Sequence, residues 1–462
     1  MKKLIFISLI SSVFSTYALA KDDFMEKLLN FYSISTNGIL DFKAKKSADG
    51  YEVKISSKQY AYKDIFNPNY TIKVEVDEGP LVTKPHFTFA KAGLVSKIDI
   101  FKVFNPEIEK ELQKGVQKRP LLHYEAIVGF SDTIQETFKL EPILADDNDS
   151  KLSLTPVVAK TTIDLNNYTG KIDIATKELL LEPKNKEGLF RVQGVTLHNE
   201  ITQKPVNNVV LFGKSMLKVE NLEVQSKPDK FALKLAFDIE SEIKKVNQKL
   251  LDFSLKNTIH TDDVHTIALF KGVKDEKIDL TLKNLGIEGV VELITFSQKM
   301  QEIQNKLLQD ANDPVKKEAA LAEYMAQVAL LNNTLVDIIN KTFLSNKSKL
   351  ILDLELQSDK KSFIKLDLLY KAKPLQGDLN SAIIGLMAQG LAIFDGDIEI
   401  KLDKELAVTL YPLSTMFLEL LKNKGFVSEK NGIYHLKAKL QGGKIVLNGK
   451  AYTLQELTTI LF

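Results

Sequence analysis

The sequence contains no cysteine and no tryptophan among its 462 residues. Without cysteine, the chain has no disulfides, no thiolate nucleophile and no cysteine-based zinc site. Its stability must therefore come from burial of apolar groups, and a hydrophobic content of 44% supplies enough material for more than one lobe. The absence of tryptophan weakens the case for a carbohydrate-stacking site, although the 13 tyrosines could substitute.

The sequence also lacks an excess of charge of either sign. It carries 62 basic and 60 acidic residues, and loss of Lys2 and Lys3 with an N-terminal leader would make the two numbers equal. A neutral chain has no general attraction for phosphate backbones. We therefore expect no nucleic-acid partner.

Residues 1–20, MKKLIFISLISSVFSTYALA, have the organisation of a secretory signal peptide. A basic start precedes a short apolar core, and Ala18-Leu19-Ala20 is a small-x-small cleavage site that would leave Lys21 first. Because Lys21 is not cysteine, lipid attachment there is excluded. The core is about half the roughly 20 residues that span a bilayer. The leader predicts export to the periplasm of a Gram-negative bacterium, and inner-membrane anchoring by an uncleaved leader is the less favoured alternative.

Strict alternation of apolar and polar residues dominates the rest of the chain. It is clearest in KFALKLAFDIE (230–240), KLILDLELQ (349–357) and SFIKLDLLYKA (362–372). Period-two runs are typical of strands with one apolar and one wet face. Short polar turns between them favour antiparallel pairing. Further strands are expected at residues 70–76, 170–175, 190–197, 217–224, 277–282 and 397–402.

The period becomes helical between about residues 290 and 344. Phe296, Met300, Ile303 and Leu307 recur at steps of three and four, and a second such stripe follows the break NDP at residues 312–314. Asp313 is a plausible N-cap, with Pro314 at the first helical position. We predict two helices in an antiparallel hairpin. Shorter helices are expected at residues 22–31, 106–117, 380–394 and 413–424, and the very apolar 380–394 is expected to be buried.

These patterns predict a β-rich α+β fold, with long curved antiparallel sheets and a helical hairpin (about 290–344) packed on an apolar face. The expected regions are the signal peptide (1–20), an N-terminal β-rich region (21–145), an antiparallel β region (146–289), the helical hairpin (290–345) and a C-terminal β region (346–462). The polar stretch at residues 145–151 is the best boundary candidate. Asn448-Gly449 predicts a closing two-residue hairpin, after which the apolar tail 454–462 should dock on the protein.

No residue can be named as catalytic, cofactor-binding or metal-ligating from a motif. The chain has no phosphate-binding loop, dinucleotide fingerprint, zinc-protease helix or nucleophile elbow. HTDDVH (260–265) and ADDNDSK (145–151) are best interpreted as ordinary polar turns, because their spacings suit neither one helix face nor a calcium loop. The basic-aromatic stretch SSKQYAYKD (56–64) is best interpreted as a strand with packed tyrosines.

Two segments resemble the YdgA-like family of Gram-negative envelope proteins. VDEGPLVTKPHFTFAKAGLVSKI (76–98) contains that family's Gly-Pro at Gly79-Pro80, although Glu78 stands where histidine is usual. GIYHLKAKLQGGKIVLNGK (432–450) is similar to its closing tyrosine strand and Asn-Gly turn. The resemblance implies an envelope protein with no established activity, and it brings no catalytic residues.

Together these features predict a non-catalytic periplasmic protein without a cofactor, acting as a structural or interaction module. The first alternative is a lipid- or lipopeptide-binding protein that uses an apolar sheet groove. The second is a hydrolase whose triad is assembled from distant residues. A lipid or an envelope protein is the expected partner, with peripheral membrane association, and the oligomeric state is open.

Overall fold

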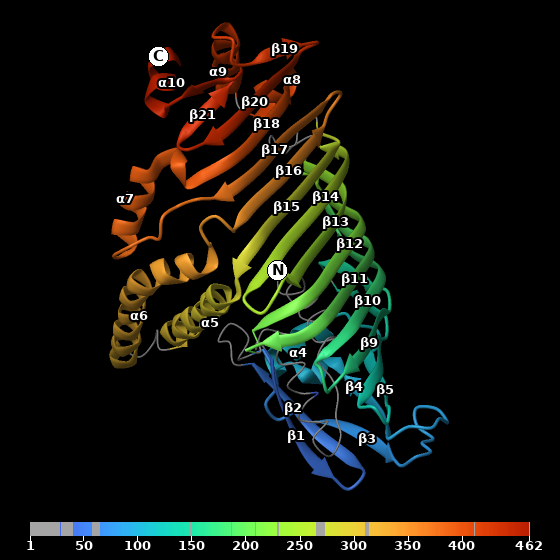
Figure 1. Cartoon of the computed structure of the whole chain (residues 1–462). Coiled ribbons are helices and arrows are strands. Elements are labelled where there is room, and N and C mark those ends of the chain that lie inside the picture. The colour runs from blue at the N-terminus through green and yellow to red at the C-terminus, as the bar shows by residue number, and fades with distance from the viewer. Residues whose placement is uncertain are drawn as a thin grey trace. The chain divides into compact units, whose positions relative to one another are not determined.

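The computed structural model (Figure 1) describes Leu28 and residues 40–57, 65–147, 149–185, 187–207, 209–228, 231–264, 273–309, 314–410 and 412–461. The chain divides into two compact units. Unit 1 comprises Met1–Pro228 and Thr295–Tyr324, and unit 2 comprises Asp229–Ile294 and Met325–Phe462. The proposed leader lies outside the described residues, as does the helix expected at 22–31 except for the helical Leu28.

Unit 1 is built mainly from strands. They are β1 (Leu40–Ser47), β2 (Gly50–Ser57), β3 (Ile72–Glu78), β4 (Ala92–Asp99), β5 (Leu121–Val128), β6 (Thr133–Leu140), β7 (Ile143–Asp146), β8 (Ser150–Leu154), β9 (Val157–Asp164), β10 (Thr169–Pro183), β11 (Gly188–Val206) and β12 (Val210–Ser226). The 3-10 helix η1 (Ile100–Val103) and helix α4 (Pro106–Gln113) lie between β4 and β5.

The strands of unit 1 pair antiparallel in the order β1-β2-β3-β4-β5-β6-β9-β10-β11-β12. Strands β7 and β8 form a separate hairpin, and β8 then pairs with the second half of β10. The polar stretch at residues 145–151, which we expected at a domain boundary, belongs to this hairpin.

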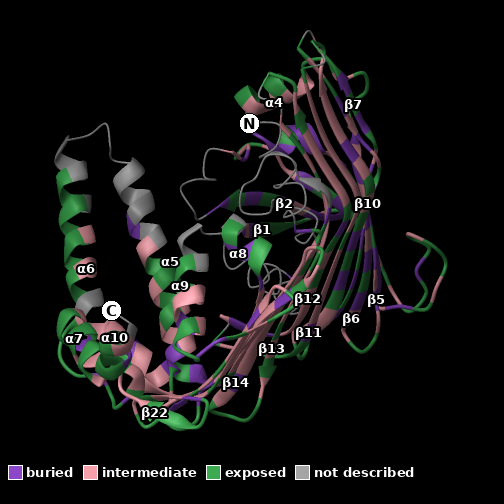
Figure 2. Cartoon of the chain, turned by 90° about the horizontal axis from the view of Figure 1, so that it is seen from above, coloured by how far each residue is buried: buried purple, intermediate pink, exposed green. Residues whose placement is uncertain are grey.

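The apolar face of unit 1 is fully buried over β5 and β6, whereas β11 and β12 are mostly half-buried. Every second residue of β5 and β6 is buried, including Leu122, Val128 and Ile134, and η1 contributes Ile100 and Phe101 to the same cluster. A buried hydrogen bond of 2.9 Å joins the Tyr124 hydroxyl to a carboxylate oxygen of Glu136 within this core. Figure 2 shows the buried residues as bands through β5, β6 and β10. Complete burial of this kind is what a stable sheet face requires.

Unit 2 contains the second set of strands and most of the helices. The strands are β13 (Phe231–Lys245), β14 (Leu250–Val264), β15 (Asp275–Gly286), β16 (Lys349–Gln357), β17 (Lys361–Tyr370), β18 (Phe394–Asp403), β19 (Ser428–Lys430), β20 (Ile433–Gln441), β21 (Lys444–Leu447) and β22 (Lys450–Tyr452). The helices are α5 (Ile287–Gln309), α6 (Pro314–Thr342), α7 (Leu379–Gln389), η3 (Gly390–Ile393), α8 (Lys404–Leu410), α9 (Pro412–Asn423) and α10 (Leu454–Leu461). Residues 295–324 of α5 and α6 are counted with unit 1.

All strand pairs described in unit 2 are antiparallel, in the order β13-β14-β15-β16-β17-β18-β20-β21-β22, with β19 also beside β20. The two units thus confirm the predicted β-rich α+β class and its antiparallel pairing. Among the helices of the described chain, none combines the length and apolar character needed to cross a bilayer.

The predicted helical hairpin is present as α5 and α6, and α6 begins at Pro314 as expected. Its N-cap candidate, Asp313, lies outside the described residues. Gly289 lets the two helix bases approach closely, because a Cβ there would lie 2.5 Å from the backbone nitrogen of Thr342. Lys341 of α6 then bonds Glu288 and Glu292 of α5, at 3.0 and 2.7 Å. Close packing and these ion pairs fix the base of the hairpin.

The base of the hairpin also packs on α7. Val336 of α6, Leu375 of the segment before α7, and Ala382 of α7 form one buried cluster. Ala382 is nevertheless the one residue of α7 that is buried, whereas Ile383, Ile384 and Met387 are exposed. The expectation that this apolar segment is buried was therefore wrong for most of α7. Hydrophobic composition alone could not show that only one narrow side of the helix meets the protein.

The C-terminal segment closes unit 2 as predicted. Asn448 and Gly449 both have positive φ, of 50° and 81°, and join β21 to β22. The tail then folds as α10, and Leu457 is buried in a cluster with Phe426, Tyr434 and Leu447. The apolar end of the chain is thus docked rather than free.

A network of polar contacts holds α9 on β20 near this cluster. The Tyr434 hydroxyl donates a 2.6 Å hydrogen bond to Glu419, which Lys404 and Lys422 also approach, at 3.0 and 3.3 Å. The hydrogen bond from Tyr434, assisted by the two lysines, lowers the pKa of Glu419 from 4.5 to about 2. The carboxylate is therefore bound more strongly in its ionised form.

We predict that Gly449→Ala lowers the free energy of unfolding by about 1 kcal/mol, because alanine is strained at a φ of 81°. No atom lies within 4 Å of the added methyl group, so backbone strain acts without a steric clash. Gly385→Ala is the matched control: it too meets open space, but lies within helix α7 and should be neutral or stabilising by up to about 1 kcal/mol. Urea titration measures both, and equal effects would contradict the assigned turn.

We predict that Glu419 makes unit 2 less stable in acid. Because its folded pKa is depressed to about 2, its contribution is present above about pH 4.5 and is lost as the pH falls toward 2. Glu419→Gln should flatten the fall in melting temperature over this window, and Tyr434→Phe should flatten it partly. Melting curves between pH 7 and pH 2.5 provide the measurement, and an unchanged pH dependence in Glu419→Gln would refute the assignment.

Candidate functional site

One face of the unit 2 sheet is formed almost entirely by aliphatic side chains. Directly opposed residues in antiparallel strands point to the same face, so the register defines three rows that cross β15, β16, β17, β18 and β20. The rows are Ile278-Leu354-Ile364-Ile400-Leu436, Leu280-Leu352-Leu366-Ile398-Ala438 and Leu282-Leu350-Leu368-Gly396-Leu440. We call these residues the aliphatic face.

The aliphatic face continues onto β14. Leu255 lies opposite Leu280, and Phe253 lies opposite Leu282. Asn257, opposite Ile278, is a polar residue in the first row, and its side-chain oxygen is buried without a hydrogen-bond partner. The face is thus broad and apolar, and the amide of Asn257 is a polar group within it.

The protein covers this face only in part. Of the three rows, Leu368 and Leu440 are buried, while the other members are half-buried. The equivalent face of β5 and β6 in unit 1 is almost completely removed from solvent. Figure 2 shows the same contrast in the chain, because β13 and β14 are mostly of intermediate exposure. An apolar surface of this size that stays accessible usually marks a binding surface.

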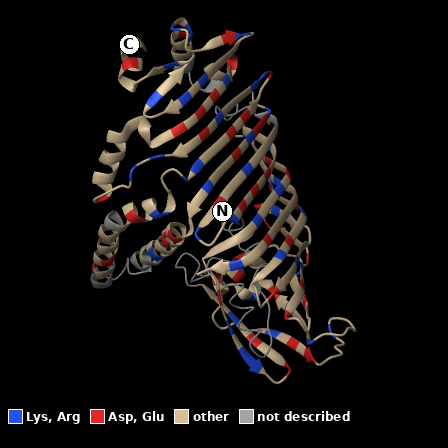
Figure 3. Ribbon diagram, in the orientation of Figure 1, with Lys and Arg blue, Asp and Glu red and all other residues tan. Residues whose placement is uncertain are grey.

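The opposite face of the same strands is charged and paired. Lys365 lies 2.7 Å from Asp353, Lys349 lies 2.7 Å from Asp367, and Lys437 lies 3.4 Å from Glu399. Figure 3 shows the two signs interspersed along β15 to β18. Neutralised surface pairs of this kind contribute little to stability, but they keep this side of the sheet wet and distinguish it from the aliphatic face.

The charged side also carries an open depression of about 450 Å³, lined by Lys349, Asp367, Asp395, Asp397 and Lys439 among others. Two of its carboxylates are paired: Asp367 binds Lys349, and Asp395 lies 3.6 Å from Lys371, which is outside the lining. The depression therefore has the character of a solvated surface rather than of an apolar ligand site.

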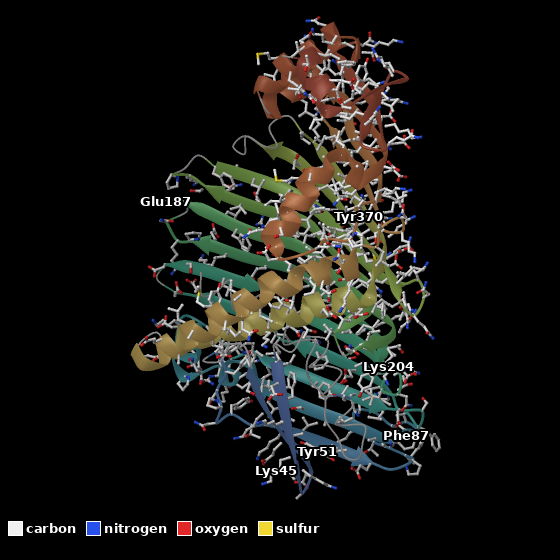
Figure 4. All side chains as sticks on the ribbon, turned by 60° about the vertical axis from the view of Figure 1, so that its left-hand side comes forward. Lys45, Tyr51, Phe87, Glu187, Lys204 and Tyr370 are labelled. Carbon is white, nitrogen blue, oxygen red and sulfur yellow. The ribbon has the colours of Figure 1, made fainter. Side chains whose placement is uncertain are left out.

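Aromatic rings occupy one end of the strands. Tyr370 at the end of β17 lies opposite Phe394 at the start of β18, with ring centroids 6.1 Å apart. Phe343, which follows α6, lies 6.1 Å from Tyr370 on its other side. Burial raises the pKa of the Tyr370 hydroxyl. Figure 4 marks Tyr370. These rings extend the apolar surface at this end of the aliphatic face.

Glu276 is placed at the other end of the aliphatic face. It lies opposite Leu356 on β16 and Ile259 on β14, two residues before Ile278. Burial raises the pKa of its carboxyl, because apolar neighbours disfavour the charged form. Glu276 is thus the ionisable group in this register row, where it could meet a polar end of a bound molecule.

Three of the described histidines lie on three different strand pairs. His123 contacts Glu141 at 3.1 Å, His198 contacts Asp173 at 2.6 Å, and His435 contacts Glu399 at 2.9 Å. Each of these contacts joins side chains of neighbouring strands or strand ends. Among the described residues no group of three or more histidine and carboxylate side chains could hold a metal ion.

The described residues of HTDDVH (260–265) and ADDNDSK (145–151) make contacts with nearby residues. His260 of HTDDVH lies 2.6 Å from Asp275 on β15, while His265 and the side chains of Asp262 and Asp263 lie outside the described residues. In ADDNDSK, Asp147 accepts hydrogen bonds from the backbone nitrogens of Asp149 and Ser150, as in an Asx turn. The centre of SSKQYAYKD, residues 58–64, lies outside the described residues.

The structure describes both segments that resemble the YdgA-like family. Glu78 ends β3, and Gly79-Pro80-Leu81 opens the loop between β3 and β4. The second segment forms β20, β21 and the turn to β22. Sequence patterns thus located the strands of the candidate site, but they could not show that its apolar face stays accessible, because that depends on what the rest of the chain covers.

Comparison with known proteins gives one family and no individual relative. No curated protein and no solved structure shows significant similarity to the chain. The family described as bacterial protein of unknown function (DUF945) matches residues 51–455, which include nearly all described strands of both units. The chain therefore belongs to the DUF945 family of bacterial proteins of unknown function.

Proposed function

We propose that the protein binds the acyl chains of a lipid or lipopeptide on the aliphatic face of unit 2. The observation that carries this proposal is the half-buried state of successive rows of leucine and isoleucine from β15 to β20. A stable protein buries such a surface against itself or against a partner. An alkyl chain offers the matching chemistry, since it needs contact and no hydrogen bonds.

The dimensions of the face suit this ligand. Each row crosses five strands, which is about 20 Å at a strand spacing of about 4.8 Å. One leaflet of a bilayer, half of a core of about 30 Å, is about 15 Å deep. An extended acyl chain can therefore lie along one row, and each methylene that leaves water contributes about 0.8 kcal/mol.

Polar groups at the ends of the face would orient such a ligand. Glu276 lies at one end among apolar neighbours, and Tyr370 lies toward the other with Phe343 and Phe394. A hydroxyl or amine of a headgroup could bond the Glu276 carboxyl, while the acyl chain follows the aliphatic rows. This arrangement uses binding and orientation, so the proposed role requires no catalytic step.

A second candidate is the non-catalytic interaction module, in which an envelope protein covers the same surface. The exposed Ile383, Ile384 and Met387 of α7 favour it, because a helix without charged residues presents a ready contact for another protein. The two candidates differ in what accompanies the purified protein: an acyl compound in the first, a polypeptide in the second.

We further propose that the protein works in the periplasm, on the basis of residues 1–20. Expression of the full chain in a Gram-negative host should give a periplasmic product whose first residue is Lys21. Cell fractionation followed by N-terminal sequencing measures this. A Lys3→Glu, Leu4→Arg leader should leave the protein in the cytoplasm, and a wild-type product that begins at Met1 in the cytoplasm would exclude export.

We predict that the protein purified from a bacterial envelope, without detergent, carries acyl compounds that organic extraction and mass spectrometry detect. Leu352→Glu places a charge at the centre of the aliphatic face and should reduce the bound acyl compound by at least ten-fold. Ile351→Glu is the matched control, because Ile351 is the next residue of β16 but lies opposite Asp367 on the charged side. Circular dichroism checks that both variants are folded.

A clean extract from the wild-type protein would overturn the acyl-binding proposal. Equal loss in both variants would also contradict it, since the effect would then not depend on the face. Recovery of a stoichiometric protein in place of a lipid, released by Leu352→Glu and retained by Ile351→Glu, would establish the second candidate instead.

A further inference from the structure

Unit 1 exposes large apolar side chains on two adjacent loops. In the loop between β3 and β4, Leu81, Phe87 and Phe89 are 43%, 69% and 77% exposed, and in the turn between β5 and β6, Phe130 is 65% exposed. We call these four residues the phenylalanine tip. Large aromatic residues are rarely left so open without a function.

The two loops lie at the same end of neighbouring strands. Ala92 at the start of β4 lies opposite Val128 at the end of β5, and the Lys91 nitrogen donates a 2.8 Å hydrogen bond to the Val128 carbonyl. The Lys91 ammonium group also lies 3.1 Å from Asp132 in the β5–β6 turn. Phe89 and Phe130 are therefore presented from one end of the sheet.

Hydrogen bonds within the β3–β4 loop hold it in a defined conformation. The Asp77 carboxylate accepts hydrogen bonds from the Thr83 nitrogen at 2.6 Å and from the Thr83 hydroxyl at 2.8 Å. Val82 and Thr88 exchange two backbone hydrogen bonds of 3.0 Å. Gly93 accommodates the loop closely, because a Cβ there would lie 1.7 Å from the Lys84 carbonyl oxygen. Exposure of Phe87 and Phe89 is thus a feature of a folded loop.

We propose that the phenylalanine tip inserts into the surface of a phospholipid bilayer. Several backbone polar groups of the loop are paired within the protein, which reduces the cost of entering an apolar medium. Phenylalanine and leucine side chains then gain by transfer from water into the acyl region. Figure 4 shows Phe87 at the outer end of this loop, directed away from the sheet.

The charges around the tip fit phosphate headgroups. Lys84 and Lys91 belong to the loop itself, and His86 is exposed beside Phe87. Lys84 is paired with Glu75 within β3, and Lys91 is paired with Asp132 in the β5–β6 turn that carries Phe130. Cations next to inserted apolar groups are the arrangement that membrane interfaces favour.

A bilayer suits the tip better than a folded protein does. A stable protein interface buries about 800 Å² on each partner and has a polar rim around an apolar centre. Four side chains at the ends of two loops offer much less surface than this. A fluid bilayer surface needs no matching shape, so a small projecting group is sufficient. The inference concerns unit 1 alone and does not depend on acyl binding in unit 2.

The test is flotation of the full chain with vesicles of phosphatidylethanolamine and phosphatidylglycerol. The wild-type protein should float with them, and Phe87→Ser with Phe89→Ser should reduce the bound fraction at least ten-fold. Leu144→Ser with Met216→Ser is the matched control, because it removes two other exposed apolar side chains of unit 1 and should float like the wild type. Both double variants change exposed positions, so folding should be preserved.

Failure of the wild-type protein to float, or equal flotation of the Phe87/Phe89 variant, would overturn the proposal. Capture of one stoichiometric protein by the tip, without vesicle binding, would also overturn it in favour of a protein partner. The extraction experiment on Leu352→Glu reports on unit 2 separately. Loss of flotation with retained acyl compound, or the reverse, therefore distinguishes the two proposals.

Discussion

The antiparallel register between neighbouring strands is the constraint on which the rest of the structure depends. Because side chains alternate with a period of two, each pairing decides for a whole strand which residues share a face. In unit 2 the register aligns Leu280, Leu352, Leu366 and Ile398 across four strands. A slip of one residue would place Asp353 or Lys365 among them. Backbone hydrogen bonding between the strands therefore determines which side of the unit 2 sheet is apolar and which is charged.

The two units differ in how far the apolar side of their strands is buried. In unit 1, the apolar side of β5 and β6 is almost completely buried, with η1 in the same core, and even the polar Tyr124 and Glu136 are paired inside it. In unit 2 the base of the helical hairpin packs on α7, and the aliphatic face stays half-buried. The same sequence pattern thus produces a core over β5 and β6 of unit 1 and an accessible surface over β15 to β20 of unit 2. The difference is one of coverage, and it is the reason for assigning a binding role to unit 2.

Much of this architecture follows from the sequence. The run Leu350 to Leu356 predicts β16, Pro314 marks the start of α6, and Asn448-Gly449 specifies a turn in which both residues have positive φ. These features are local, so short patterns suffice. The pairing of β6 with β9 around the β7–β8 hairpin is not local, and only the folded chain shows it.

The candidate sites were less predictable than the fold. A period-two pattern identifies Phe87 and Phe89 as residues on one side of an extended segment, but it normally implies burial on that side. The loop is instead fixed by the hydrogen bonds of Asp77 and by the close approach of Lys84 to Gly93, while Phe87 and Phe89 stay exposed. In α7, similarly, composition suggested burial, whereas the helix meets the protein through one narrow side, with Ala382 buried and Leu386 partly buried. Exposure is a property of the tertiary arrangement, so apolar sequence cannot by itself distinguish a core from a binding surface.

An accessible aliphatic face also has a thermodynamic consequence for unit 2. Any molecule that binds the folded face and not the unfolded chain stabilises the fold by an amount that grows with its concentration relative to its dissociation constant. The cross-strand ion pairs on the opposite face cannot substitute for this, since exposed pairs each contribute only about 0 to 1 kcal/mol. Occupancy by such a molecule and the stability of unit 2 should therefore rise together, whereas the core of unit 1 around β5 and β6, which the chain itself covers, should be much less sensitive. A molecule that binds this open face, as proposed, would thus couple the folding of unit 2 to its own supply.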